Sequence, residues 1–241
     1  MGFLSQRVER SDLKAGDHIY SWRTPVFAYS HHGIYIGDDK VVHLTQEENL
    51  SAGASSSFYV SSSAHTYAAL CIDSECASRE HKSGVVMSCL NCFLGNGSLY
   101  RFEYGVSPVV LMAKVRSGTC TLAKSDPPEK VIHRAMHLLQ NGFGKYDLLS
   151  NNCEDFAMYC ATGLLVCGKK RSGASGQVSS FVSIVATAMS YVPLKMLVSN
   201  PVTLVASSVA QISFNRYALD VGVRSDATKV EVEDIVVVNS R

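Results

Sequence analysis

The sequence has almost no excess charge of either sign. Its 241 residues carry 22 Lys and Arg against 21 Asp and Glu, which gives a formal net charge of +1. Proteins that bind DNA or RNA usually present a strongly basic surface to the phosphates, so the composition argues against a nucleic-acid partner. Charged residues make up 18% and hydrophobic residues 46%. This balance is typical of a folded chain that is soluble or attached to a membrane surface.

The N-terminus lacks the features of a secretory signal. The stretch MGFLSQRVERSDLKAGDHIYSW contains no basic segment followed by a long apolar run. We therefore expect a cytoplasmic chain, either free or peripheral to an intracellular membrane, in a reducing compartment. In such a compartment the eight cysteines are expected to be thiols, metal ligands or catalysts rather than structural disulfides.

The C-terminal part is the most apolar, but it lacks a long uninterrupted apolar run. Residues 178–214 contain Lys195 as their only ionised side chain. Pro193 and Pro201 divide this segment into pieces of roughly 15, 7 and 13 residues, each shorter than the ~20 that a spanning helix needs. Two alternatives remain open. The segment forms two helices packed on the preceding domain, or it is an interfacial or re-entrant membrane anchor with basic residues 169–171 facing anionic head groups.

Hydrophobic periodicity predicts a mixture of strands and helices. Alternating patterns and turn signals indicate strands, whereas the spacing of apolar residues, an initial Pro and a terminal Gly indicate helices. Because these elements follow no regular βαβ order, we predict an α+β fold. The expected strands are 17–22, 30–37, 40–45, 98–106 and 109–115, and the expected helices are about 129–140 and 153 to near 163.

The stretch SNNCEDFA places a thiol at the start of a predicted helix. With Asn152 or Asn151 as the N-cap, Cys153 falls in the first turn, where unpaired N–H groups and the helix dipole favour negative charge. This position can lower a cysteine pKa well below its usual ~8.5, which would make Cys153 a candidate nucleophile. The alternative is a small, partly buried residue with no chemical role.

A nucleophilic cysteine needs a base, and three histidines lie on one predicted hairpin. His31, His32 and His43 are the candidates, and the turn at residues 37–39 decides which of them share a face. A three-residue loop puts His31 beside His43, whereas a two-residue loop puts His32 there, because a slip of one residue exchanges the faces of a strand. The periodicity leaves both possibilities open.

Three motifs in this order resemble the lecithin:retinol acyltransferase (LRAT) family: GDHIYSWR, HHGIYIGDDKVVHLT and LLSNNCEDFA. The resemblance covers about residues 12–165 and is that of a plant-type member with a cysteine-rich insertion. It implies a circularly permuted papain-like fold, in which an antiparallel sheet packs against the helix that carries the nucleophile. The family pattern makes Cys153 the nucleophile, His31 the base and His43 the group that orients the base.

The family resemblance also implies a reaction. The Cys153 thiolate would attack an acyl ester, usually of a phospholipid, and the acyl-enzyme would pass its acyl group to an alcohol, an amine or water. Backbone N–H groups at the helix start are suited to an oxyanion hole. We therefore expect an acyltransferase or a phospholipase A-type hydrolase at a membrane surface, with no catalytic cofactor. The alternatives are a papain-like amidase or peptidase, and a non-catalytic module that binds a protein partner.

The domain boundaries follow from the motifs and the composition. We expect an LRAT-like domain at 12–165, with the cysteine-rich insertion at about 66–97. Residues 166–177, rich in basic, Gly and Ser residues, are expected to be a linker. Residues 178–241 would be an apolar helical segment and tail, associated with a membrane in one of the two alternatives.

The insertion contains two pairs of cysteines with a spacing suited to metal. Short-spaced pairs separated by a loop can supply the four thiolates of a tetrahedral structural zinc site. His81 could replace one ligand, and reduced thiols without metal are the alternative. The predicted ligands are Cys71, Cys76, Cys89 and Cys92.

Overall fold

The computed structural model of the protein describes residues 6–23, 29–45, 84–114, 116–166, 175–197 and 200–235. A six-stranded sheet in the order β1-β6-β2-β3-β4-β5 forms the centre of the domain, and its neighbouring strands are antiparallel. The predicted α+β class is therefore confirmed. The strands are β1 (Gln6–Arg7), β2 (His18–Arg23), β3 (Tyr29–Gly37), β4 (Lys40–Thr45), β5 (Gly84–Cys89) and β6 (Leu99–Arg101).

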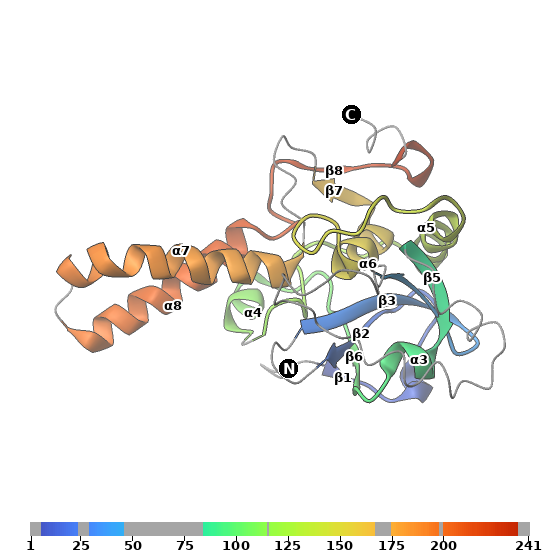
Figure 1. Cartoon of the computed structure of the whole chain (residues 1–241), viewed down its shortest axis with the longest axis horizontal. Helices are drawn as coiled ribbons and strands as arrows, with labels where there is room; N and C mark the ends of the chain where they lie inside the picture. The colour runs from blue at the N-terminus through green and yellow to red at the C-terminus, as the bar shows by residue number, and fades with distance from the viewer. Residues whose placement is uncertain are drawn as a thin grey trace, which may run out of the picture.

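Helices cover the sheet and extend beyond it (Figure 1). Two short 3-10 helices, η1 (Arg10–Asp12) and η2 (Val232–Asp234), and a small second sheet of β7 (Leu164–Val166) with β8 (Ala227–Lys229) complete the described elements. The helices are α3 (Leu90–Leu94), α4 (Pro108–Ala113), α5 (Pro128–Asn141), α6 (Cys153–Thr162), α7 (Gly176–Leu197) and α8 (Pro201–Ala218).

The two faces of the sheet pack against different helices, because side chains alternate along each strand. Ile34 and Val42 point to the face covered by α5 and α6, where they share a core with Phe156. Val41 points to the other face and packs with Phe93 of α3. This division determines which side chains of β3 and β4 can approach α6 directly.

The turn between β3 and β4 answers the question that the sequence left open. Gly37 pairs with Lys40, so the loop has two residues, both with positive φ. However, the register shifts between Tyr35 and Gly37, and such a bulge adds one residue to β3. The extra residue exchanges the two faces of the sheet for every residue of β3 that precedes it. As a result His31, and not His32, lies on the same face as His43.

Helix α6 has strong signals at both ends. The Asn152 side chain accepts hydrogen bonds from the N–H groups of Glu154 and Asp155, and Asp155 accepts one from the N–H of Asn152. Gly163 ends the helix in the left-handed conformation, which glycine adopts without steric cost. The predicted helix from Cys153 to near Gly163, with Asn152 as one of the two proposed caps, is confirmed.

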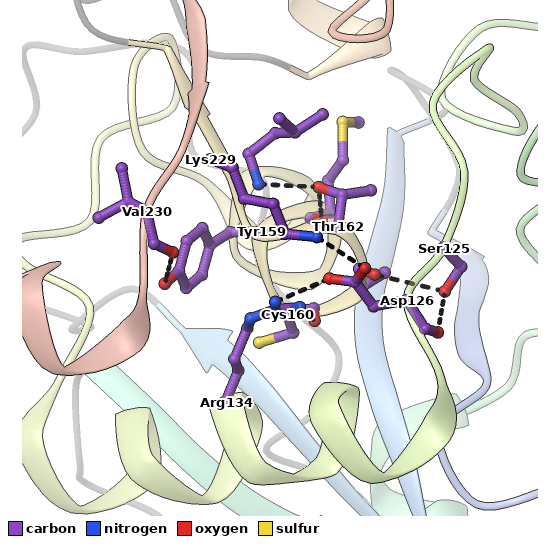
Figure 2. A network of polar contacts seen from close by, with 11 residues as sticks. Ser125, Asp126, Arg134, Tyr159, Cys160, Thr162, Lys229 and Val230 are labelled. Carbon is purple, nitrogen blue, oxygen red and sulfur yellow. Dashed lines mark hydrogen bonds and ion pairs between the residues drawn. The ribbon is translucent and has the colours of Figure 1, made fainter.

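A buried arginine ties the end of α6 to α5 and to the C-terminal tail (Figure 2). Arg134 of α5 donates to the Cys160 carbonyl at 3.0 Å and to the Asp126 carboxylate at 2.7 Å. Lys229 of β8 donates to the second oxygen of Asp126 at 2.7 Å. The Tyr159 hydroxyl donates to a carbonyl of the same tail, so residues far apart in the chain are fixed around α6.

The predicted strand over 109–115 is wrong, because residues 108–113 form helix α4. Ser107 caps this helix by accepting a hydrogen bond from the N–H of Val110, and Pro108 occupies the first turn. Ser followed by Pro is a helix start signal. It outweighs the strand preference of the two valines that follow.

Helices α7 and α8 pack against each other as an antiparallel hairpin that projects from the domain (Figure 1). Helix α7 continues through Pro193, where the sequence had suggested a break. Several large apolar side chains of the hairpin are exposed. No helix in the described part of the chain is long and apolar enough to cross a membrane. The exposed side chains are Ile184, Val185, Met189, Val202, Val205, Val209 and Phe214.

Candidate active site

Cys153 is the first residue of α6, and its thiol lies against the backbone of β3. The Sγ–H donates to the Ser30 carbonyl at 3.8 Å, and the N–H of His32 is directed at the sulfur. These two backbone groups stand on either side of His31. The side chain of Cys153 is buried, with 3% of its surface exposed. The structure thus places the predicted nucleophile at the backbone of the predicted base.

The thiol can reach this position because β4 pairs with only part of β3. The β3–β4 pairing extends from Gly37 back to Ile34. In an antiparallel sheet, the backbone groups of alternate residues point to the same edge of a strand. The backbone groups of residues 30 and 32 therefore point to the same edge of β3, the one that faces away from β2. At this edge they are contacted by Cys153 and by Gln177 of α7.

His31 and His43 form the hydrogen-bonded pair that the resemblance implied. The Nε2 of His31 and the Nδ1 of His43 are 2.9 Å apart, and the Nε2 of His43 lies 2.8 Å from the Ser88 hydroxyl. Both rings pack against Phe93, with centroid distances of 5.2 and 5.4 Å. Ser88 of β5 was not expected from the sequence, because no local motif marks it.

The histidine pair and α6 approach β3 from different sides. The rings of His31 and His43 lie with Phe93 on the face that packs against α3, whereas α6 packs on the opposite face. Cys153 reaches the plane of the sheet at the open edge of β3. The site therefore lies at this edge, beyond the end of the pairing between β3 and β4.

A second histidine network, which the sequence analysis missed, lies on the α6 side of β3. His32 is fully buried, and its Nε2 is 2.7 Å from the Ser30 hydroxyl. Its Nδ1 is 2.8 Å from the Nε2 of His18, whose Nδ1 is 2.6 Å from the Tyr104 hydroxyl. The alternation of GDHIYSWR was the available signal, because it places His18 on the same face as the core residue Tyr20.

Burial controls the charge state of this network. Loss of solvent lowers the pKa of His32 to about 4, although the Glu154 carboxylate opposes the shift. Loss of solvent also lowers the pKa of His18 well below its ordinary value, and the neighbouring His32 adds to the effect. Both rings are therefore neutral at pH 7 and act as hydrogen-bonding groups of the core.

The expectation of a lowered pKa for the nucleophile is wrong in this structure. Burial raises the pKa of Cys153 to about 12, and the carboxylates of Glu154 and Asp155 act in the same direction. The backbone N–H groups of His32 and of Cys153 itself favour the thiolate, but they are outweighed. At neutral pH the resting thiol therefore keeps its proton, and a base is needed to remove it.

The predicted zinc site is only partly within the described residues. Cys89 ends β5, and its sulfur accepts a hydrogen bond of 3.4 Å from the N–H of Cys92 in α3. Cys71 and Cys76 lie outside the described residues. Within the ranges that the structure describes, no group of three or more His, Cys, Asp or Glu side chains is arranged to hold a metal ion. The four-cysteine zinc site stays a prediction from spacing.

Comparison with known proteins assigns the chain to a family. The family profile described as lecithin retinol acyltransferase matches residues 11–166, more than half of the chain, so the protein belongs to the LRAT family. It is similar to Protein LEAD-SENSITIVE 1 of Arabidopsis thaliana, with 48% identity over 240 residues, or 98% of this chain and 90% of the relative. The resemblance to a plant-type member of the family is thereby confirmed.

Proposed function

We propose that the protein is a thiol-dependent acyltransferase or phospholipase A-type hydrolase that acts on phospholipid acyl esters. The observation that carries this proposal is the position of Cys153, whose sulfur lies against the backbone on both sides of His31. His31 in turn is hydrogen-bonded to His43. A thiol, a base and a group that orients the base are the parts that nucleophilic catalysis requires. Membership of the LRAT family supports the same reaction.

In the first half-reaction, His31 removes the proton of Cys153 as the sulfur attacks the acyl carbonyl. The bond to His43 uses the Nε2 of His31, so Nδ1, the ring nitrogen nearer the backbone, is the one assigned to the thiol. The tetrahedral intermediate collapses to a thioester, and the leaving lysophospholipid oxygen takes the proton from His31. Because the pKa of the resting thiol is raised, proton removal accompanies attack rather than preceding it.

In the second half-reaction, an acceptor attacks the thioester. Water gives a free fatty acid, whereas an alcohol or amine gives a transferred acyl group. His31 takes the acceptor's proton, and the thiol recovers it. The N–H groups of Glu154 and Asp155 are occupied by the Asn152 side chain. The N–H of Cys153 is not among those bonded to Asn152, and we therefore assign it to the oxyanion.

The chain order supports a circularly permuted papain-like arrangement. In this protein the histidine strands β3 and β4 precede the helix that carries Cys153, the order that the permuted form requires. A papain-like amidase or peptidase shares this arrangement of thiol and imidazole. The ester substrate is favoured because the family match is to an acyltransferase.

We also propose that the enzyme works at a membrane surface, with the α7–α8 hairpin in contact with lipid. The hairpin projects from the domain (Figure 1) and exposes large apolar side chains such as Met189 and Phe214, at 77% and 64%. The sequence between Gln177 and Arg216 contains one residue that is charged at neutral pH, Lys195. An apolar surface with almost no charge suits insertion at the level of head groups and upper acyl chains.

Mass spectrometry of the intact protein tests the proposed reaction. After incubation with phosphatidylcholine vesicles, the wild-type protein is expected to carry one added acyl mass, and Cys153→Ala none. Cys120→Ala is the matched control, because it removes a buried thiol away from β3 and leaves the adduct in place. A wild-type protein without adduct, whose Cys153 is nevertheless alkylated by iodoacetamide, would favour a non-catalytic binding module instead.

A further inference from the structure

Gln177, in the first turn of α7, pairs with the backbone of β3 next to the active site. Its Oε1 accepts from the N–H of Ser30 at 2.8 Å, and its Nε2 donates to the carbonyl of Ser30 at 3.1 Å. A primary amide carries one acceptor and a donor, as a peptide unit does. Gln177 therefore takes the place of a strand partner where β4 no longer pairs with β3.

The carboxylate of Glu154 fixes Gln177 in this position. Glu154 is fully buried and accepts hydrogen bonds from the Ser175 hydroxyl at 2.6 Å and from the N–H groups of Gly176 and Gln177 at 2.8 and 3.3 Å. It also accepts one from the Gln177 side chain at 3.1 Å. A carboxylate at a helix N-terminus is stabilised by the free N–H groups and the dipole, so Glu154 of α6 caps α7.

The start of α7 packs closely against the loop at Gly118. A Cβ at Gly176 would lie 2.9 Å from the backbone nitrogen of Gly118, and one at Gly118 would lie 2.7 Å from Cγ of Gln177. Contacts this short would require the backbone or the Gln177 side chain to move. The position of Gln177 is thus set by packing as well as by hydrogen bonds.

The thiol and the Gln177 amide meet at one carbonyl. The Ser30 oxygen accepts from Gln177 at 3.1 Å and from the Cys153 thiol at 3.8 Å. Ser30 directly precedes His31, so the orientation of this peptide influences both the thiol and the backbone that carries the base.

We infer that Gln177 is a positioning residue for the reaction of Cys153 with His31. It holds the Ser30 peptide at the open edge of β3, and through it the relative orientation of thiol and imidazole. The inference rests on the proposed function of Cys153. It also places a required part of the active site outside the family match, which ends at residue 166, in a segment whose composition suggested a linker.

The test uses Gln177→Met in the full-length protein, because Met keeps the length of the side chain and removes both hydrogen-bonding groups. We expect kcat for acyl transfer from phosphatidylcholine vesicles to fall about 10- to 100-fold with KM unchanged, since a small misplacement of reacting groups costs this much. Gln140→Met, at an exposed site on α5, is the matched control and should stay within twofold of wild type.

A second readout does not depend on the substrate. The rate of Cys153 alkylation by iodoacetamide, measured against pH, should fall at pH 7 in Gln177→Met, and its midpoint should rise because the base is displaced from the thiol. The titratable groups described near the sulfur are His31, His32, Glu154 and Asp155, and none of them is replaced in this variant. Glu154 and His32 lose their contacts with the Gln177 amide, at 3.1 and 3.4 Å. A residue with only a structural role would lower the melting temperature and leave the alkylation profile of the folded protein unchanged.

The outcomes separate the inference from the proposed function. If the wild-type protein forms no acyl adduct but Gln177→Met shifts the alkylation profile, the reaction is wrong and the positioning role stands. If the wild-type protein is acylated and Gln177→Met matches it in kcat and in alkylation, the inference is overturned. If the Met variant fails to fold, Gln177→Asn is tested by the same two measurements, because its side chain is one methylene too short to reach both Ser30 groups.

Discussion

At the scale of single residues, the neutral histidines of the core make stability depend on pH. The folded-state pKa of His32 is about 4, and that of His18 is also lowered, whereas both titrate near 6.5 in the unfolded chain. Between pH 6.5 and about 4 the unfolded chain therefore binds more protons than the folded one. The free energy of unfolding should fall on acidification by about 1.4 kcal/mol per pH unit for each histidine.

Urea unfolding at pH 7, 6 and 5 measures this dependence. All three measurements are made above pH 4, so the lowered pKa values of Asp126 and Asp147 contribute little to the dependence of stability on pH. His32→Gln, which keeps a hydrogen-bonding side chain and removes one titrating ring, should reduce the slope by about half. Equal free energies of unfolding at pH 7 and pH 5 would show that the histidines are not held neutral.

Residue by residue, the sequence indicated part of the site and could not indicate the rest. Cys153 was identifiable because its helix start is encoded locally, by Asn152 and the polar turn before it. The choice between His31 and His32 depended on a bulge near the turn, which an alternating pattern does not reveal. The raised pKa of Cys153 arises from burial, a property of the packed molecule rather than of the helix start.

At the scale of elements, Arg134 connects α5 to the C-terminal end of α6 (Figure 2). Its side chain is 3% exposed, so replacing it with Met leaves the Cys160 carbonyl and one oxygen of Asp126 without their donor. Breaking a buried pair in this way typically costs about 3–5 kcal/mol. We expect Arg134→Met to lower the free energy of unfolding by that order.

Chemical denaturation of Arg134→Met beside Lys130→Met measures the effect. Lys130 lies on an exposed part of the same helix, and its replacement should change stability by no more than about 0.5 kcal/mol. Similar losses in both variants would show that the arginine network contributes nothing beyond the helix itself.

Elements with local signals were predicted well, and elements that depend on distant contacts were not. Helix α5 begins at Pro128 and ends before Gly142, close to the predicted 129–140, because proline and glycine act within one turn. Helix α4 is an exception, because the apolar run over 109–115 suggested a strand although Ser107 and Pro108 supply a local start for the helix. The β7–β8 pairing joins residues more than sixty positions apart and has no local signature.

At the scale of the whole molecule, the α7–α8 hairpin should determine binding to lipid surfaces. Glu at the exposed positions Met189 and Phe214 places charge where apolar side chains would enter the interface. We expect the double variant Met189→Glu and Phe214→Glu to bind vesicles at least about tenfold more weakly, because each large apolar side chain contributes about 1.5–3 kcal/mol when buried.

Co-sedimentation with phosphatidylcholine vesicles, with and without anionic lipid, measures this binding. Val223→Glu, at an exposed apolar position beyond the hairpin, is the control and should bind as the wild type does. Unchanged sedimentation of the double variant would contradict a lipid contact of the hairpin.

The overall organisation was visible in the sequence only up to the family match. The three motifs identified the domain because they lie in elements that form the site. The composition of residues 166–177 suggested a linker, yet residues 175–177 contact Glu154 inside the domain. Composition does not reveal hydrogen bonds between residues twenty or more positions apart. The contact between residues 175–177 and Glu154 is therefore visible only in the structure.

The central claim is that His31, rather than His32, serves the Cys153 thiol, and the acylation rates of three histidine variants test it most directly. The rate of acyl-adduct formation from phosphatidylcholine vesicles should fall about 10²–10⁴-fold in His31→Ala, as for loss of a general base. His43→Ala should lie between this variant and wild type, because His43 orients the ring of His31. His32→Gln should stay within a few-fold of wild type at pH 7. An inactive His32→Gln beside an active His31→Ala would contradict the account.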